Sequence, residues 1–340
     1  MKNIWLFPER VAEDNGYSLV VKQDFEESKV KESDIQIYYS SSDLELEYPS
    51  IFIKRQNILG TKRIINLLNF EPTSNIHHSQ LKFLESIPSS EIAKIFCGDV
   101  IFYQALRKLF PEKQITVRLH NCFSRILVRK RMMNLKVGLP FLYNLRSISK
   151  VEQEIFRDPN VFIIFLSQED LSFYKSVVSK ENAMLSAVKL NLPKSGRVSL
   201  KSINKIVWFG GIESHKKDSI DWFIKQVFLP LRTKFPNLEF HLFGKNTVNF
   251  TKEKEEIFGH GIYHGNGFPF KENSIYINPD IIGGGVKIKI KTYIENNIRF
   301  ISSPYGFEGY SKTLIDQKEV IVQPENNWYK FLFDLLINNK

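Results

Sequence analysis

Short apolar runs recur along the chain and are separated by polar or amphipathic segments. In the amino-terminal half, the runs that predict strands cover residues 4–7, 35–39, 51–54, 91–97, 115–119 and 160–166. Strands that are apolar on both faces are typical of a parallel sheet covered by helices. Residues 100–110 have the period of an amphipathic helix. Strands that alternate with helices in this way favour parallel pairing.

The alternation restarts in the carboxyl-terminal half, where strands are predicted over residues 205–209, 238–243, 275–277 and 300–301. The helix after the first of these strands has one apolar face, formed by Ile220, Phe223, Ile224, Val227 and Leu231. Between the halves, residues 191–203 are polar and contain Pro193 and Gly196, as linkers do. We therefore expect an α/β protein with two Rossmann-like domains, residues 1–190 and 204–340.

Composition agrees with this expectation. The 340 residues are 43% hydrophobic and 25% charged, and the length suits two domains of ordinary size. The longest apolar run, residues 161–166, is far shorter than the ~20 residues of a membrane-spanning helix, and the first apolar run is too short for a signal peptide. Cys97 and Cys122 predict neither a disulfide framework nor a zinc site. We expect a cytoplasmic protein whose net charge of +10 favours an acidic partner.

One stretch of the carboxyl-terminal half has the pattern of an anion site. A predicted strand is followed by three consecutive glycines, Gly283, Gly284 and Gly285. Glycine lets the backbone approach a ligand closely, and a helix that begins there directs its N–H groups and positive dipole end at the ligand. Lys287 and Lys289 add full charges, so the stretch predicts a pyrophosphate site. The alternation of apolar residues and lysines over residues 286–291 would by itself predict an exposed strand.

This stretch resembles the nucleotide-sugar site of retaining GT-B glycosyltransferases of family 4. The family pattern is a proline, a Gly-Gly-Gly-Thr-Arg-x-Lys run, a helix with a glutamate, a short strand, and Gly-x-Glu-Gly. Its proline, lysine and last glutamate correspond here to Pro279, Lys289 and Glu308. Lys287 replaces the arginine and Val286 the threonine. The helix glutamate, which holds the donor ribose in the family, falls on Thr292, whose hydroxyl binds more weakly than a carboxylate.

The resemblance continues at the start of the carboxyl-terminal half. The first strand there leads to Gly210 and Gly211, and the next strand ends at Gly244. In the family this region contacts the donor and supplies a cation to its phosphates, which implies His215 or Lys216. The alternative is that Lys216 is an ordinary exposed lysine.

A second glycine-rich stretch, residues 259–267, contains His260 and His264. The spacing of four residues would suit a metal site on a helix, but the surrounding glycines disfavour a helix. We interpret this stretch as a loop that lines the nucleotide base, and we expect no metal.

The amino-terminal half offers residues for an acceptor. Arg118, His120 and Asn121 lie at the carboxyl end of a predicted strand, where ligands of open parallel sheets bind. This Arg-x-His-Asn string is similar to the family motif that faces the acceptor. It implies acceptor contacts from Arg118 and Asn121 and a catalytic role for His120, which can exchange a proton near pH 7. The alternative is that these residues cap the strand. Gly16 is a further acceptor candidate by resemblance, or an ordinary turn residue.

Residues 124–150 contain seven basic and no acidic residues: Arg125, Arg129, Lys130, Arg131, Lys136, Arg146 and Lys150. Apolar residues are interleaved with them, as in segments that bind an anionic membrane surface. A solvated helix face is the alternative, and nucleic acid is the less favoured partner.

Taken with the resemblance, these features imply a transferase without cofactor. It would move a sugar, with retention, from a nucleotide-diphosphate sugar to a glycan or lipid-linked acceptor in surface polysaccharide or glycoconjugate biosynthesis. Lys287, Lys289 and the glycine-loop N–H groups would stabilise the departing diphosphate. The missing glutamate at Thr292 motivates an alternative, a non-catalytic subunit that binds a sugar nucleotide or a glycan. An oxidoreductase is disfavoured because no Gly-x-Gly-x-x-Gly follows the first strand.

Overall fold

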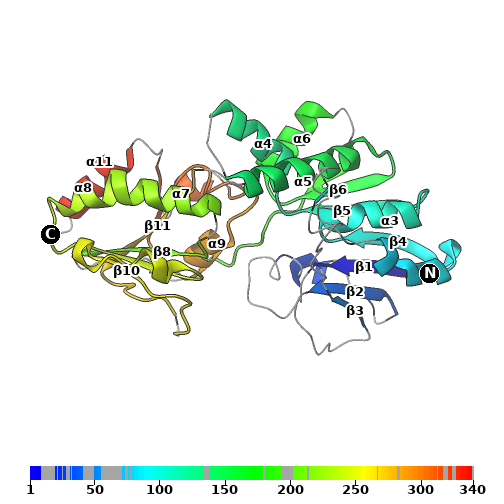
Figure 1. Ribbon diagram of the computed structural model, residues 1–340, viewed down its shortest axis with the longest axis horizontal. Helices are drawn as coiled ribbons and strands as arrows, with labels where there is room; N and C mark the ends of the chain where they lie inside the picture. Colours follow the sequence, from blue (N-terminus) through cyan, green and yellow to red (C-terminus); the bar gives the residue numbers. More distant parts are fainter. Residues whose placement is uncertain are drawn as a thin grey trace. The chain divides into compact units, whose positions relative to one another are not determined.

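A computed structural model describes residues 1–8, 20, 22–24, 26–27, 31, 33–40, 50–54, 71–72, 76, 78–133, 138–178, 181–192, 202–212, 214–265, 267–281, 284–311, 313–316, 321–323 and 327–338. The chain forms two compact units, Met1–Val188 and Lys189–Lys340 (Figure 1). Most of the predicted linker lies outside the described residues, so the domain limits given above stay a prediction.

The first unit is built on a seven-stranded parallel sheet in the order β3-β2-β1-β4-β5-β6-β7. Its strands are β1 (Lys2–Phe7), β2 (Ile35–Ser40), β3 (Ser50–Lys54), β4 (Ile92–Cys97), β5 (Ile115–Leu119), β6 (Val161–Phe165) and β7 (Ala183–Leu185). Residues 20, 22–24 and 26–27 are helical. The further helices are α3 (Tyr103–Leu109), α4 (Phe123–Met132), α5 (Leu139–Arg157) and α6 (Gln168–Val177), with short 3-10 turns at η1 (His78–Gln80), η2 (Lys82–Ser86), η3 (Ser89–Glu91) and η4 (Val100–Phe102). The six predicted strands are confirmed, and β7 was not predicted.

The core of this unit lies between the sheet and helices α3, α5 and α6. Ile95, Val117 and Ile163 are fully buried on the sheet, and Leu106 and Ile155 meet them from the helices. Ser167 caps α6, because its hydroxyl accepts the N–H of Asp170 at 3.1 Å.

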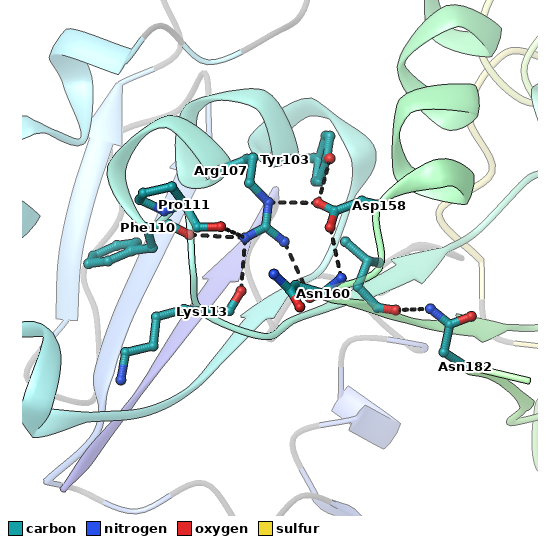
Figure 2. Close-up of polar contacts among 9 residues, drawn as sticks. Tyr103, Arg107, Phe110, Pro111, Lys113, Asp158, Asn160 and Asn182 are labelled. Carbon is teal, nitrogen blue, oxygen red and sulfur yellow. Dashed lines mark hydrogen bonds and ion pairs between the residues drawn. The ribbon is translucent and has the colours of Figure 1, made fainter. Parts of the chain in front are cut away.

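Arg107 organises the turn between α3 and β5 (Figure 2). Its Nε donates to the Asp158 carboxylate at 2.6 Å, and the hydroxyl of Tyr103 donates to the same carboxylate at 2.8 Å. The rest of the guanidinium donates to four backbone carbonyls at 2.9 to 3.2 Å, those of Phe110, Pro111, Lys113 and Asn160. One side chain thus binds carbonyls from the turns before β5 and β6. The Asn160 carbonyl also accepts the N–H of Ile115 at 3.0 Å, at the start of β5.

The second unit has a six-stranded parallel sheet in the order β10-β9-β8-β11-β12-β13. Its strands are β8 (Lys205–Phe209), β9 (Glu239–Phe243), β10 (Ile257–Gly259), β11 (Ser274–Asn278), β12 (Phe300–Ser302) and β13 (Ile321–Val322). Its helices are α7 (Ser214–Phe223), α8 (Leu229–Arg232), α9 (Ile288–Glu295), α10 (Thr313–Asp316) and α11 (Trp328–Asn338), with 3-10 turns at η6 (Thr247–Phe250) and η7 (Glu253–Glu255). The four predicted strands are confirmed.

Alternate residues of β8 point to opposite faces of this sheet. Ile206 and Trp208 pack with α7, α8 and α11, which lie together on one side in Figure 1. Val207 packs on the other face, against α9 and the loop after β10. Both faces are therefore apolar, and this explains why the strand was visible in the sequence as a continuous apolar run.

The helix with the predicted apolar face continues from α7 through a π-helical turn, η5 (Ile224–Phe228), into α8. The N–H of Leu229 donates to the carbonyl of Ile224, five residues back. Pro230 has no N–H and cannot form the usual helical bond, so a wider turn just before it costs little. All five residues of the predicted face are at most 4% exposed.

Both sheets have the doubly wound strand order. Successive strands are added toward one edge of the sheet, and the chain then returns to the middle and adds the remaining strands toward the other edge. The reversal falls between β1 and β4 in the first unit and between β8 and β11 in the second. Ligands of such sheets bind outside the carboxyl ends of the strands at this switch point. None of the described helices is long and apolar enough to cross a membrane.

Candidate anion-binding site

The glycine and lysine stretch lies at the switch point of the second unit. Gly210 follows β8 and Asp280 follows β11, the two strands that flank the reversal. The lysines continue into helix α9, so the alternative of an exposed strand is wrong. The helix forms because Ile290, Tyr293 and Ile294, spaced by three and one, are all buried against the sheet.

Lys289 carries its charge into the protein without full compensation. Its Nζ is closed to solvent and makes no hydrogen bond, and the nearest carboxylate, Oδ2 of Asp280, is 3.9 Å away. The ammonium lies 5.1 Å from the ring centre of Trp208. Burial lowers the pKa of Lys289 to about 8, Asp280 opposes this shift, and the charges of Lys216 and Lys287 add to it. A buried ammonium with two further cations and one carboxylate around it is a ready partner for an anion.

Lys287 closes the glycine loop. Its Nζ donates to the carbonyl of Gly284 at 2.6 Å, and Gly285 has a φ of +65°, which a residue with a side chain rarely adopts. The hydroxyl of Tyr310 donates to the Lys287 carbonyl at 2.8 Å and accepts the N–H of Lys291 at 3.1 Å. These bonds fix the start of α9. Gly283 lies outside the described residues.

The glycines after β8 and β9 pack against each other. Gly244 has a φ of +131°, and a Cβ on it would lie 2.2 Å from the carbonyl oxygen of Gly210. Lys216, in the first turn of α7, is half-buried and close enough to Lys289 to affect its pKa. Gly211 is partly exposed beside this turn. The side chain of His215 is not among those described.

Thr292 and Glu308 occupy different parts of the site. The hydroxyl of Thr292 donates to the carbonyl of Ile288 at 3.1 Å, one turn earlier in α9, so it is already bonded within the helix. Glu308 is 8% exposed and lies in the turn after β12. Gly306 allows this turn to pack closely, because a Cβ on it would lie 2.1 Å from Nδ2 of Asn278.

Buried polar residues at the ends of β11 and β12 support the same edge of the sheet, and they were not predicted. The N–H of Ser303 donates to the Asn278 carbonyl at 3.0 Å, and the Ser303 hydroxyl accepts the N–H of Gly306 at 3.0 Å. Asn278 also donates to the Ser302 hydroxyl at 3.2 Å. The signal in the sequence was a polar residue directly after each apolar run.

The predicted acceptor residues lie in the first unit, at the end of β5. Nε2 of His120 is 2.9 Å from the carbonyl oxygen of Gly98, just after β4. Because a carbonyl only accepts, Nε2 carries the proton. Burial lowers the pKa of His120 to about 3, and the charge of Arg118 adds to the shift. The expectation of proton exchange near pH 7 is therefore not supported, although a neutral imidazole can still form hydrogen bonds.

Arg118 is 2% exposed, and its guanidinium forms an ion pair with Asp24 and donates to the Ser186 carbonyl at 3.2 Å. This arrangement ties β5 to two other segments, which is a structural role. Asn121 is partly exposed after β5. Gly16 lies outside the described residues.

His260 takes part in a chain of polar contacts on β9. Its Nε2 lies 2.9 Å from Nδ1 of His241, whose Nε2 is 2.8 Å from the Glu239 carboxylate. The His260 ring stacks on Phe243 at 4.4 Å. His264 is exposed. Among the described residues, no group of three potential ligands could hold a metal ion.

The sequence matches no protein-family model and no curated protein. The structure is similar to solved structures over nearly its whole length. For TarM the TM-score is 0.65 at 11% identity, covering 99% of this chain and 91% of that chain. For WaaG, a glycosyltransferase involved in lipopolysaccharide biosynthesis, it is 0.61 at 9% identity, covering 99% and 90%. For a UDP-forming trehalose-phosphate synthase from Burkholderia xenovorans it is 0.61 at 13% identity, covering 98% and 90%. The predicted α/β fold of GT-B type, with two Rossmann-like units, is confirmed.

Proposed function

We propose that this protein is a glycosyltransferase that takes its sugar from a nucleotide-diphosphate sugar. The observation that carries the proposal is the buried Lys289 ammonium, which lacks a hydrogen bond at the switch point of the second sheet. Proteins of similar fold support it, since WaaG is a glycosyltransferase, the trehalose-phosphate synthase is UDP-forming, and TarM from S. aureus was crystallised with UDP.

The main catalytic requirement on the donor unit is positive charge that stabilises the leaving group. When the bond from the sugar carbon to the diphosphate oxygen breaks, negative charge develops on that oxygen. We propose that Lys287, Lys289 and the N–H groups at the start of α9 stabilise this charge. Retention of configuration and independence of metal belong to the proposal through the family resemblance.

The proposed acceptor is a glycan or a lipid-linked glycan of surface polysaccharide or glycoconjugate biosynthesis. In the first unit, His120 is neutral with its proton on Nε2, and we propose that its imidazole lies beside the acceptor sugar. Asn121 is the second acceptor contact that we propose. Arg118 is left out because its guanidinium is held by Asp24.

We also propose that the protein is cytoplasmic and contacts the inner face of an anionic membrane through residues 124–150. The last turn of α4 is basic, with Arg129, Lys130 and Arg131. Beside it, Met132 is 82% exposed and Leu139, at the start of α5, is 80% exposed. Basic residues with apolar neighbours bind such surfaces reversibly, at about 1 kcal/mol per charge. Lys136 lies outside the described residues.

Titration calorimetry with nucleoside diphosphates tests the donor site, after a thermal-shift screen of nucleotide sugars has identified the base. Changing both Lys287 and Lys289 to Ala should weaken binding by about 2–4 kcal/mol, since each charge-assisted bond contributes ~1.5–3 kcal/mol and the two overlap. Lys234→Ala is the matched control, because Lys234 is exposed in the turn before β9, at the opposite edge of the sheet. Equal affinities for the double variant and the control would overturn the assignment.

A non-catalytic sugar-nucleotide-binding subunit is the second candidate. It is favoured by Thr292, which replaces the family glutamate and whose hydroxyl is bonded within its own helix. Incubation with the donor found by the screen separates the two candidates. Release of nucleoside diphosphate, by hydrolysis or by transfer, supports the enzyme. Tight binding with no release over many hours supports the subunit.

A further inference from the structure

A groove on the first unit is not used by the proposed glycosyl transfer. Helices α4 and α6 lie over α5 (Figure 1), and a cavity of about 650 Å³ opens between the three helices. This is within the size range of sites for small ligands. Its apolar lining consists of Leu127, Val128, Phe156, Phe173, Val177 and Val178.

Polar ties hold the groove in shape. The Glu152 carboxylate of α5 accepts the N–H groups of Phe123 and Ser124 at 2.7 and 2.6 Å, which fixes the start of α4 on α5. Arg125 of α4 forms a 2.9 Å ion pair with Asp170 of α6. Beyond these ties the two helices present apolar walls, with Val128 41% and Val177 56% exposed. Filling a preformed groove with an apolar ligand removes these side chains from water, which is favourable in free energy.

The charged lining of the groove is basic. Arg131 and Arg157 are its charged residues, both exposed, and no acidic residue lines it in the described part of the chain. The groove therefore combines an apolar interior with a cationic rim, which is the complement of a lipid with an anionic head group.

We propose that this groove binds one hydrocarbon chain of an anionic membrane lipid, with the lipid phosphate against Arg131 and Arg157. The inference rests on the membrane contact proposed above and gives that contact a defined site. A lipid chain is favoured over an apolar protein helix because the adjoining surface is itself cationic and carries exposed Met132 and Leu139, as a membrane-facing surface requires. Each methylene group that enters the groove should raise affinity about fourfold.

Vesicle co-sedimentation of the full chain tests the proposal, with phosphatidylcholine vesicles and with vesicles that also contain phosphatidylglycerol. The groove variant combines Val128→Asn and Val177→Asn, which change polarity but not charge. The rim variant combines Arg131→Gln and Arg157→Gln. Met184→Asn is the control, because Met184 is also an exposed apolar residue of the first unit but lies on β7, outside the groove lining.

The wild type and the control should bind phosphatidylglycerol vesicles and bind phosphatidylcholine weakly. The groove variant should lose at least about tenfold in partition, equivalent to less than two methylene groups. The rim variant should lose about fivefold per arginine, and its binding should depend less on salt. Thermal melting checks that every variant is folded. Calorimetry should give the wild-type affinity for nucleoside diphosphate in every variant. This measurement tests the donor site independently of lipid binding.

Three results would overturn the proposal. The first is that the groove variant binds the vesicles as tightly as the wild type does, which would mean that surface charge alone explains the binding. The second is competition by glycerol phosphate, a head group without a chain, as effective as competition by the lipid. The third is a loss of self-association in the groove variant with no change in lipid binding, which would make a second copy of the chain the occupant.

Discussion

Lys289→Met should stabilise the ligand-free protein while it weakens nucleotide binding. The 17% exposed Lys289 side chain holds a charge that is poorly compensated, because its Nζ makes no hydrogen bond and Asp280 is 3.9 Å away. Methionine has a similar length and carries no charge. Replacing buried charge by a well-packed apolar side chain is often stabilising.

The magnitude follows from the pKa of Lys289, which burial lowers from 10.5 to about 8. At 1.36 kcal/mol per pH unit, this difference corresponds to about 3 kcal/mol, and the attraction of Asp280 is already included in it. The variant should therefore have a free energy of unfolding higher by up to about 3 kcal/mol at pH 7.

The sign depends on pH in a defined way. Below pH 8 the lysine is protonated in both the folded and unfolded states, so the full cost is present. Between pH 8 and 10.5 the unfolded state binds the proton and the folded state has lost it, so the stability of the wild type rises with pH. The advantage of Lys289→Met should shrink over this window and vanish above it.

Urea unfolding followed by tryptophan fluorescence measures the effect, because Trp208, Trp222 and Trp328 all report on the second unit. Lys234→Met is the matched control and should change stability by less than about 0.5 kcal/mol. If Lys289→Met is no more stable than the wild type at pH 7, and the difference does not change up to pH 10.5, the reasoning about Lys289 is refuted.

Three further predictions concern the donor site and the fold. The affinity for nucleoside diphosphate should be constant up to about pH 7.5 and fall above pH 8, because an anion binds the protonated Lys289; calorimetry across pH 7 to 9.5 checks this, and Lys289→Met should show a flat profile. Thr292→Val should weaken donor binding about fivefold if the hydroxyl turns to the ribose, with the melting midpoint nearly unchanged, and equal affinity would exclude that contact. Arg107→Met should destabilise the first unit by about 3 kcal/mol, measured by urea unfolding, because the partly buried Asp158 carboxylate loses its cation and four carbonyls lose a donor. The exposed Arg146→Met should have little effect.

The fold could be predicted where burial is complete on both faces of a strand. Strand β6 is apolar over its whole length and β11 over its three central residues, because helices or loops cover both sides of each sheet. The edge strands β7, β10 and β13 could not be found in this way, since two or three residues carry no period. In α9 the alternation of lysines indicated a strand, and the burial of Tyr293 and Ile294 on one helix face decided otherwise.

The candidate site could be located from the sequence, but not its electrostatics. The glycine pattern marks the loop, whereas the burial of Lys289 depends on Trp208, which is 81 positions earlier in the chain and is brought close only by the sheet. Arg118 shows the opposite case. Its place at a strand end suggested a ligand contact, but its partner Asp24 is 94 positions away and buries the charge. Such pairs, which are far apart in the sequence, cannot be predicted from the spacing of residues along the chain.

The same strand order supports different chemistry at the two switch points. In the second unit, the edge beside β8 and β11 gathers Lys216, Lys287 and Lys289 around one carboxylate. In the first unit, the edge beside β4 carries a neutral His120 bonded to the Gly98 carbonyl, and the charge of Arg118 near it is paired with Asp24. A diphosphate is stabilised by cations, whereas a sugar hydroxyl is uncharged and can be bound by a neutral hydrogen-bonding side chain. Because the topology is shared, the side chains at each edge provide the argument for the proposed assignment of donor to the second unit and acceptor to the first.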